Sequence, residues 1–299
     1  MAHDLDKALA GISGILVTPY DADGEIAPAK LAPILDRAIG AGVQLPVVNG
    51  NTGEFYALTT EEACTMATEV AALIDGRVPL LAGVGRGIRD ACRLAKTSAD
   101  AGASALMIHQ PPDPFVAPRG TVDYVKAISD ASGGLPMMLY LRNDAIGIKG
   151  IEALCAIPGV KGVKWATPNP MKLAEAIAAC DPGITWVGGL AEVWAPTFYA
   201  VGARGFTSGL INVWPERSVA ILEALNASDY EKARALIADM AAFEEIRAEE
   251  LNGTNVTGVK SALIAMGQDC GPTRPPSAWP LTPAQGDKLT GFLSANKLI

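Results

Sequence analysis

Short apolar runs rich in β-branched residues recur along the first two thirds of the chain, and each has the length of a strand. There are eight of them: SGILVTPY, VQLPVVNG, VPLLAGVG, ASALMIHQ, LPMMLYLR, VKGVKWAT, ITWVGGL and ARGFTSGL. Alanine-rich segments with helical apolar spacing lie between them, for example KLAPILDRAIGAG and EEACTMATEVAALI. Because the strands are apolar on both faces, the alternation predicts a parallel sheet enclosed by helices.

Eight strand–helix units favour a closed (β/α)8 TIM barrel, which we expect to occupy residues 1–225. From 226 to 299 only helical spacing continues, in DYEKARALIADMAAFEEIRAEEL, TGVKSALIAMG and TPAQGDKLTGFLSANKL. These segments predict a C-terminal helical extension packed on the barrel within the same domain. The alternative, a doubly wound sheet, would require a glycine-rich phosphate loop after the first strand, and TPYDADGEIA is not one.

Composition limits the classes of partner. The 299 residues carry a formal net charge of −8, and the lysines and arginines do not cluster, so we expect neither nucleic acid nor an anionic membrane surface as a partner. The N-terminal residues lack the basic start of a signal peptide, and no apolar run has membrane-spanning length. The sequence therefore predicts a cytoplasmic protein.

Cysteine and histidine offer little material for metal or triad chemistry. The five cysteines lack CxxC spacing and fall mostly on apolar helical segments: Cys64, Cys92, Cys155, Cys180 and Cys270. We expect them to be reduced packing residues. With only His3 and His109 in the chain, a histidine metal site or a Ser-His-Asp triad is disfavoured. Covalent chemistry would therefore have to come from a nucleophile of another type.

A lysine inside an apolar strand is the strongest chemical candidate. Lys164 lies between Val163 and Trp165 in VKGVKWAT, near the end of the predicted sixth strand, where barrel sites form. Burial disfavours the charged ammonium, so the pKa should fall and a neutral amine become available as a nucleophile. The alternative is a lysine that reaches out to solvent, which is what we expect of Lys161.

Two other strand ends supply polar groups. Tyr140 ends the run PMMLYLRN, where a phenol can relay protons to a lysine on the next strand, or simply pack at the rim. The second strand leads into VNGNTGEFYALTTEE, in which TTEE predicts a helix start. The backbone N–H groups of Asn51, Thr52 and Gly53 can form a cradle for a carboxylate, although a plain turn is the alternative.

Taken in order and spacing, GILVTPYDADGEIA, GNTGEFYALTTEE, Tyr140 and GVKWAT make the chain resemble the dihydrodipicolinate synthase and N-acetylneuraminate lyase superfamily of Schiff-base aldolases over almost its whole length. The resemblance implies that Lys164 is the Schiff-base lysine, Tyr140 the catalytic tyrosine and Thr52 the hydroxyl of the proton relay. It also implies that amides of Asn51 and Thr52 hold the keto-acid carboxylate.

The same resemblance extends to the last strand and the loop acid. It implies that residues 205–208, including Thr207 and Ser208, line the wall opposite the lysine. Glu54 is expected to be structural rather than catalytic.

Two departures separate the chain from true dihydrodipicolinate synthases. The segment after Tyr140 is YLRNDAIG in place of the arginine-bearing turn of those enzymes, and MIHQPPDPF lacks their paired tyrosine. Both argue against lysine biosynthesis as the function. GNTGEF and the polar YLRND resemble instead the branch that contains 5-dehydro-4-deoxyglucarate dehydratase, with Arg142 and Asn143 as substrate-binding residues. His109, at the end of the fourth strand, either contacts substrate or caps the strand, and we expect the structural role.

The leading hypothesis is a Schiff-base lyase acting on a pyruvate-type 2-keto acid, as a dehydratase or aldolase on a hydroxylated 2-keto-3-deoxy acid such as 5-dehydro-4-deoxyglucarate. One alternative is a 4-hydroxy-tetrahydrodipicolinate synthase, and another is a non-catalytic keto-acid-binding barrel. By this mechanism we expect no metal and no organic cofactor, and the partner is a small molecule. By resemblance we also expect a homo-oligomer, a tetramer or dimer.

Overall fold

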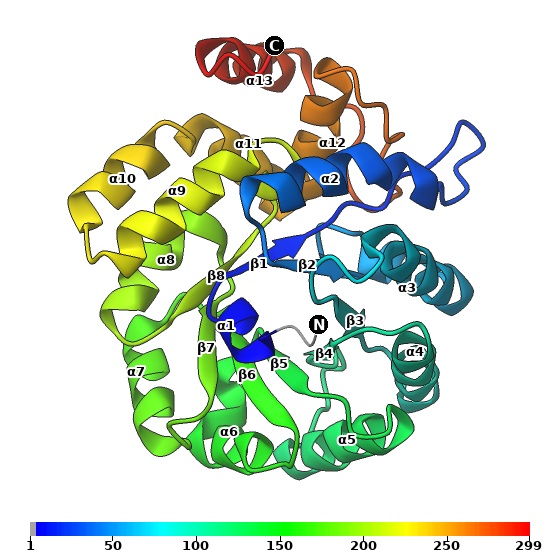
Figure 1. Ribbon diagram of the computed structural model, residues 1–299, viewed down its shortest axis with the longest axis vertical. Helices are drawn as coiled ribbons and strands as arrows, with labels where there is room; N and C mark the ends of the chain where they lie inside the picture. Colours follow the sequence, from blue (N-terminus) through cyan, green and yellow to red (C-terminus); the bar gives the residue numbers. More distant parts are fainter. Residues whose placement is uncertain (1–3) are drawn as a thin grey trace.

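The computed structural model describes residues 4–299 and contains a closed barrel of eight parallel strands (Figure 1). The strands are β1 (Ile12–Ile15), β2 (Leu45–Val48), β3 (Leu81–Val84), β4 (Ala105–His109), β5 (Met137–Leu141), β6 (Val160–Trp165), β7 (Thr185–Gly188) and β8 (Gly205–Ser208). Consecutive strands pair in parallel, and β8 closes the ring against β1. The predicted strands and the predicted barrel are confirmed.

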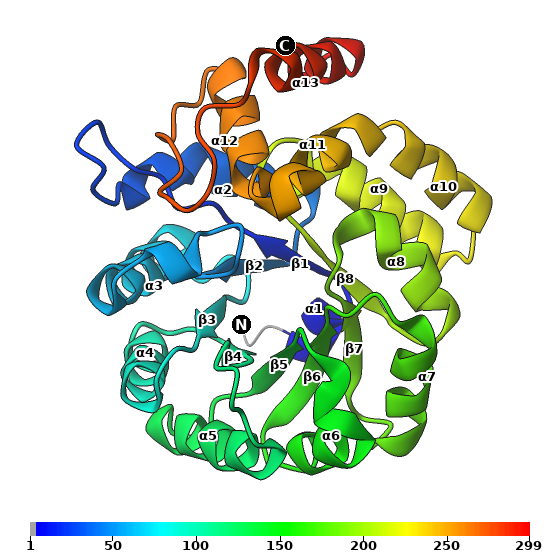
Figure 2. The same cartoon turned by 180° about the vertical axis from the view of Figure 1, so that it is seen from behind.

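A helix follows each strand and covers the outside of the barrel (Figures 1 and 2). These helices are α2 (Ala32–Ala41), α3 (Thr60–Ile74), α4 (Ile88–Asp100), α5 (Pro118–Ala131), α6 (Gly147–Cys155), α7 (Pro170–Ala179), α8 (Ala191–Ala200) and α9 (Pro215–Asn226). Short 3-10 turns are η1 (Pro28–Leu31), η2 (Phe55–Ala57), η3 (Asp144–Ile146) and η4 (Leu210–Asn212). The predicted start of α3 is a capping box between Thr59 and Glu62. Among residues 4–299, no helix is long and apolar enough to cross a membrane.

Apolar side chains fill the barrel and close its amino end. Met107, Met138 and Val187 belong to a buried cluster inside the ring of strands, and Ala8 and Leu9 of α1 (Leu5–Leu9) join it. A second, larger cluster lies between the strands and the surrounding helices. Because the interior is packed, polar chemistry has room only at the carboxyl ends of the strands.

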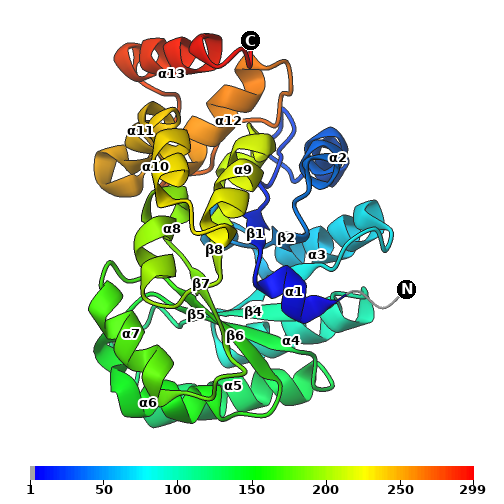
Figure 3. The same ribbon diagram turned by 60° about the vertical axis from the view of Figure 1, so that its left-hand side comes forward.

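The C-terminal extension lies on one side of the barrel, next to α9 and α2 (Figure 3). It consists of α10 (Tyr230–Ala238), α11 (Ala241–Asn252), α12 (Asn255–Ala265) and α13 (Pro283–Ala295). The segment DYEKARALIADMAAFEEIRAEEL is predicted as one helix from its apolar spacing, but it forms two, α10 and α11. The turn between them buries Met240 completely, a tertiary contact that helical spacing does not reveal.

A buried ion pair joins this extension to the loop after β2. Nζ of Lys260 in α12 lies 2.7 Å from Oε1 of Glu54, and both side chains are at most 2% exposed. The backbone N–H of Arg274 donates to the other carboxylate oxygen of Glu54 at 2.8 Å. Lys260 also donates to the carbonyl of Pro272 at 2.9 Å. Glu54 therefore has the structural role expected from the sequence.

We predict that Lys260→Met destabilises the protein by about 3–5 kcal/mol, because it leaves the Glu54 carboxylate buried without its cation. Lys288→Met is the matched control: Lys288 pairs with Glu245 at 2.7 Å, and the two side chains are 37% and 64% exposed, so its loss should cost about 0–1 kcal/mol. Urea unfolding measures both free energies. Equal costs for the two variants would contradict the prediction.

Candidate active site

Three polar side chains form one layer at the carboxyl ends of adjacent strands. His109 on β4 aligns with Tyr140 on β5, which aligns with Lys164 on β6. Met107 and Met138, two residues earlier on β4 and β5, lie in the cluster inside the barrel. Since side chains alternate along a strand, His109, Tyr140 and Lys164 also face inward. All three are buried, so the sequence-predicted lysine and tyrosine are brought together.

Lys164 is buried without a negative partner. Its Nζ lies 3.8 Å from the centre of the Tyr140 ring, and it forms no ion pair with any residue from 4 to 299. Burial, and then the positive charge of Arg142, lower the pKa of Lys164 to about 7. A large fraction of the side chain is therefore neutral amine near pH 7. Lys161, earlier on the same strand, is exposed as expected.

Tyr140 is held by the loop after β2. Its hydroxyl accepts a hydrogen bond from Nδ2 of Asn51 at 2.9 Å. Burial raises the pKa of Tyr140 to about 12, so the phenol is protonated at neutral pH. The expected contact with the hydroxyl of Thr52 does not occur in the described chain. The Thr52 side chain is turned toward Gly209, with Oγ1 3.2 Å from the position of a Cβ at that glycine.

The loop after β2 offers two free backbone amides, not three. The N–H of Gly53 already donates to the carbonyl of Gly50 at 3.0 Å, and the carbonyl of Gly53 accepts from Oγ1 of Thr18 at 2.6 Å. The expectation that Gly53 binds a carboxylate is therefore wrong, because its amide is used to close the turn. Within residues 4–299 the N–H groups of Asn51 and Thr52 have no partner.

The last strand contributes one inward residue instead of the predicted pair. Oγ of Ser208 lies 3.0 Å from Oγ of Ser218 in α9, which donates to Glu192 at 2.6 Å. Ser208 thus faces the surrounding helices, and its expected place in the wall is wrong because neighbouring residues on a strand point to opposite faces. Gly205 lies at the amino end, against the carbonyl of Gly11. Of the predicted pair, only Thr207 remains a candidate for the wall opposite Lys164.

Arg142 lies beside a residue that the sequence analysis missed. It is exposed after β5 and lies close enough to Tyr56, 43% exposed in η2, for its positive charge to oppose the rise that burial causes in the pKa of Tyr56. The Tyr56 ring lies 5.7 Å from that of His109. Only the aromatic pair in GEFYAL signalled this residue. Asn143 is also exposed, but its Oδ1 accepts a hydrogen bond from the N–H of Ala145. This oxygen therefore stabilises the start of η3.

His109 is a neutral imidazole that contacts the backbone at the end of β2 and the Phe55 ring. Its Nε2 lies 2.9 Å from the carbonyl of Asn49, and its ring stacks on Phe55 at 4.3 Å. Burial, and then the positive charge of Lys164, lower the pKa of His109 to about 3, so Nε2 carries a proton and donates to Asn49. A Cβ at Gly83 would lie 2.1 Å from the same carbonyl. The contact therefore requires glycine at this position of β3.

Comparison with known proteins agrees with the barrel fold. A sequence model described as the Dihydrodipicolinate synthetase family matches residues 8–296. The chain belongs to this family. It is accordingly a lyase of the Schiff-base aldolase type, as the family relatives are lyases and dehydratases.

Relatives within the family differ in their stated activity. A 4-hydroxy-tetrahydrodipicolinate synthase from Exiguobacterium sibiricum is 30% identical over 89% of this chain and 91% of its own. A probable 5-dehydro-4-deoxyglucarate dehydratase from Rhizobium rhizogenes is 28% identical over 98% of both chains. The crystal structure of dihydrodipicolinate synthase from Oceanobacillus iheyensis is similar with a TM-score of 0.93 and 36% identity, covering 99% of both chains.

We predict that His109→Phe flattens the fall in stability with decreasing pH. The folded pKa of about 3 lies below the ordinary value of about 6.5, so only the unfolded chain takes up this proton between those values. The stability due to neutral His109 is therefore present above pH 6.5 and is lost as the pH falls, by roughly 1.4 kcal/mol per unit.

Urea unfolding of both proteins at several pH values between 7 and 4 measures this effect. Carboxylates contribute to both curves, and their contribution cancels in the difference. The advantage of the parent protein over His109→Phe should shrink by about 3 kcal/mol across that range. A difference that does not change with pH would contradict the prediction.

Proposed function

We propose that the chain forms a Schiff base between Lys164 and a 2-keto acid, and that it acts on a hydroxylated 2-keto-3-deoxy acid such as 5-dehydro-4-deoxyglucarate, as a dehydratase or an aldolase. The observation that supports this most strongly is the burial of Lys164 without a carboxylate partner. A structural lysine would have such a partner, as Lys260 does. A lysine held partly neutral is suited to attack a carbonyl.

The first half of the reaction forms the imine. The neutral amine of Lys164 attacks the C2 carbonyl, and the free amides of Asn51 and Thr52 bind the neighbouring carboxylate. Tyr140 gives its proton to the oxygen of the carbinolamine, which leaves as water and yields a protonated imine. The side-chain amide of Asn51 keeps the phenol oxygen in place through the 2.9 Å hydrogen bond from Nδ2, and it stabilises the phenolate that results.

The second half uses the acidity that the imine gives to C3. The Tyr140 phenolate, whose acid has a pKa of about 12, takes the C3 proton and an enamine forms. In a dehydration the enamine electrons expel the C4 hydroxyl, which leaves as water with a proton from the phenol. In a cleavage C3 keeps its proton: the Tyr140 phenolate takes the proton of the C4 hydroxyl, C4 becomes an aldehyde, and the electrons of the C3–C4 bond form the enamine at the imine. The phenol then returns a proton to C3. Hydrolysis of the imine then frees Lys164 and the keto-acid product.

The polar groups beyond Lys164 support a hydroxylated, acidic substrate. Arg142 supplies a fixed positive charge, and Tyr56 supplies a hydroxyl beside it. Together they match a substrate with a second anionic or polar end, whose hydroxyls need partners when they lose water. The Rhizobium rhizogenes relative, a probable dehydratase for such an acid, supports the same substrate class.

A second candidate is a 4-hydroxy-tetrahydrodipicolinate synthase. It is favoured by the Exiguobacterium sibiricum relative, which carries this name at 30% identity. It requires the same imine but a different second substrate, so Arg142 would meet the carboxylate of an aldehyde. A non-catalytic keto-acid-binding barrel, the third possibility, would not need the low pKa of Lys164.

We predict that borohydride reduction in the presence of pyruvate gives a stable adduct on the parent protein and none on Lys164→Ala. The initial rate of adduct formation should rise with pH through about 7, the pKa of Lys164, because the neutral amine is the nucleophile. Intact mass and peptide mapping measure the adduct. The matched control is Lys161→Ala, which removes an exposed lysine from the same strand and should trap pyruvate normally.

Trapping on Lys164→Ala at the parent rate would overturn the Schiff-base assignment. No adduct on the parent protein with a panel of keto acids would support the non-catalytic barrel.

We predict that kcat/KM for 2-keto-3-deoxy sugar acids exceeds that for condensation of pyruvate with aspartate semialdehyde in the same preparation. Arg142→Ala should lower kcat/KM for the sugar acids by roughly 10–100-fold, the effect of losing a hydrogen bond to a charged group. Lys161→Ala removes a distant positive charge and should leave it unchanged. Efficient condensation without activity on sugar acids would establish the synthase and leave the role of Lys164 intact.

A further inference from the structure

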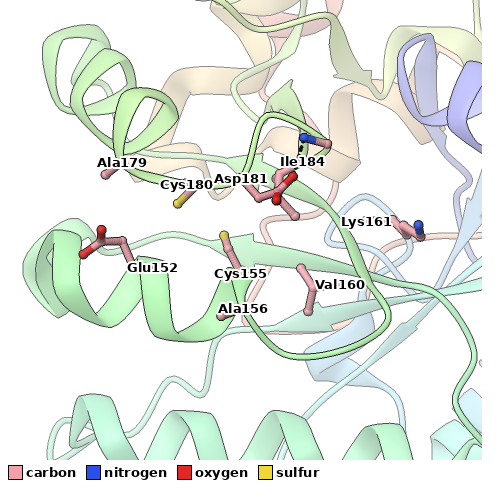
Figure 4. A pocket seen from close by; sticks show the side chains of 10 residues that line it. Glu152, Cys155, Ala156, Val160, Lys161, Ala179, Cys180, Asp181 and Ile184 are labelled. Carbon is pink, nitrogen blue, oxygen red and sulfur yellow. Dashed lines mark hydrogen bonds between the residues drawn. The ribbon is translucent and has the colours of Figure 1, made fainter.

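Two cysteines meet at the end of the barrel opposite to the Lys164 layer. Cys155 is the last residue of α6, and Cys180 follows the last residue of α7. Both line a cavity of about 490 Å³ that also borders Val160, the first residue of β6. In Figure 4 the two sulfur atoms point toward each other across the space between the helix ends. This site has no place in the proposed reaction.

The two thiols interact with each other. This interaction raises the pKa of Cys155 and lowers that of Cys180. Burial nevertheless raises the pKa of both. Cys155 is 7% exposed, whereas Cys180 is half-buried. Cys180 is therefore the more accessible and the more readily ionised thiol of the pair.

The charged groups around the pair do little to activate it. Glu152 on α6 raises the pKa of Cys180 further. Asp181 lines the same cavity, and its Oδ1 accepts from the N–H of Gly183. Lys161 is the cation of this lining, and in Figure 4 its amine points away from the sulfurs. The pair is thus accessible and mutually oriented, but only a small fraction of Cys180 is thiolate at neutral pH.

We propose that Cys155 and Cys180 form a reversible disulfide when the protein meets a peroxide, closing segment 155–180 into a covalent ring that contains β6 and Lys164. The Cys180 thiolate attacks one oxygen of hydrogen peroxide, which breaks the O–O bond, releases water after protonation and leaves a sulfenic acid. The sulfur of Cys155 then attacks that of Cys180, and the sulfenic oxygen leaves as water. The thiols lose two hydrogen atoms, and one peroxide becomes two waters.

This bond would join two helix ends that flank β6. It restricts the unfolded chain over segment 155–180, so the oxidised form should be more stable than the reduced form. The strand inside the ring is the one that carries Lys164. We therefore expect the free energy of unfolding of the barrel to increase under oxidising conditions.

The test uses the full chain, reduced and freed of reductant, then treated with hydrogen peroxide at pH 7.0 and 8.5. Non-reducing peptide mapping should show one intramolecular cross-link between Cys155 and Cys180, and dithiothreitol should reverse it. The rate should rise by about tenfold per pH unit while the pH is below the pKa of Cys180. The Tm of the oxidised protein should be higher by on the order of 5 °C.

Cys155→Ser and Cys180→Ser should each abolish the cross-link and the rise in Tm. Cys92→Ser is the matched control, since Cys92 is also half-buried but has the carbonyl of Ala127 as its partner; it should behave as the parent protein. Failure to form the cross-link at pH 8.5, or a cross-link through another cysteine, would overturn the proposal. Mapping and Tm involve no substrate, so neither outcome depends on the function of Lys164.

Discussion

Burial of one amine without a counter-ion is the constraint on which the site depends. Removal of Lys164 from water disfavours its charge, and the charged group that shifts its pKa further in the same direction is another cation, Arg142. The Tyr140 ring lies against the amine but cannot neutralise a full charge. The protein therefore bears a destabilising interaction at this point, and the packed barrel around it has to supply the difference.

The same chain contains the opposite solution to the same problem. Lys260 is also fully buried, but it is paired with Glu54 and with the carbonyl of Pro272. Burial lowers the pKa of Lys260, but the Glu54 carboxylate opposes that shift, and the pair joins two distant segments. Desolvation is common to both lysines. The presence or absence of a carboxylate partner therefore decides whether a buried lysine is suited to be a nucleophile or to form a structural ion pair.

The two lysines show which features of the fold and the site could be predicted from the sequence. The eight strands were predictable because each is a local apolar run, and Lys164 was predictable because it interrupts one near a strand end. Lys260 interrupts an equally apolar run, TGVKSALIAMG, yet its meaning depends on Glu54, far away in the chain. Local pattern shows that a lysine will be buried, but it does not show what will face it.

Other differences have the same origin. Ser208 and Thr207 are neighbours in one motif, but the alternation of a strand sends them to opposite sides, and only the register of β8 determines which faces inward. Gly53 belongs to a motif suited to anion binding, yet its amide closes the turn. The contact between Asn51 and Tyr140 joins β2 to β5 across the barrel, so no spacing in the sequence encodes it.

The link between Glu54 and the C-terminal extension has a consequence for synthesis of the protein. Glu54 and its partner Arg274 are 220 positions apart, and the ribosome delivers the N-terminal part of the chain first. While β2 and its loop emerge, neither Lys260 nor Arg274 exists, so the Glu54 carboxylate stays hydrated and the loop that holds Asn51 lacks its anchor. The loop that holds Asn51 therefore gains this anchor only after α12 and the segment that contains Arg274 have been synthesised.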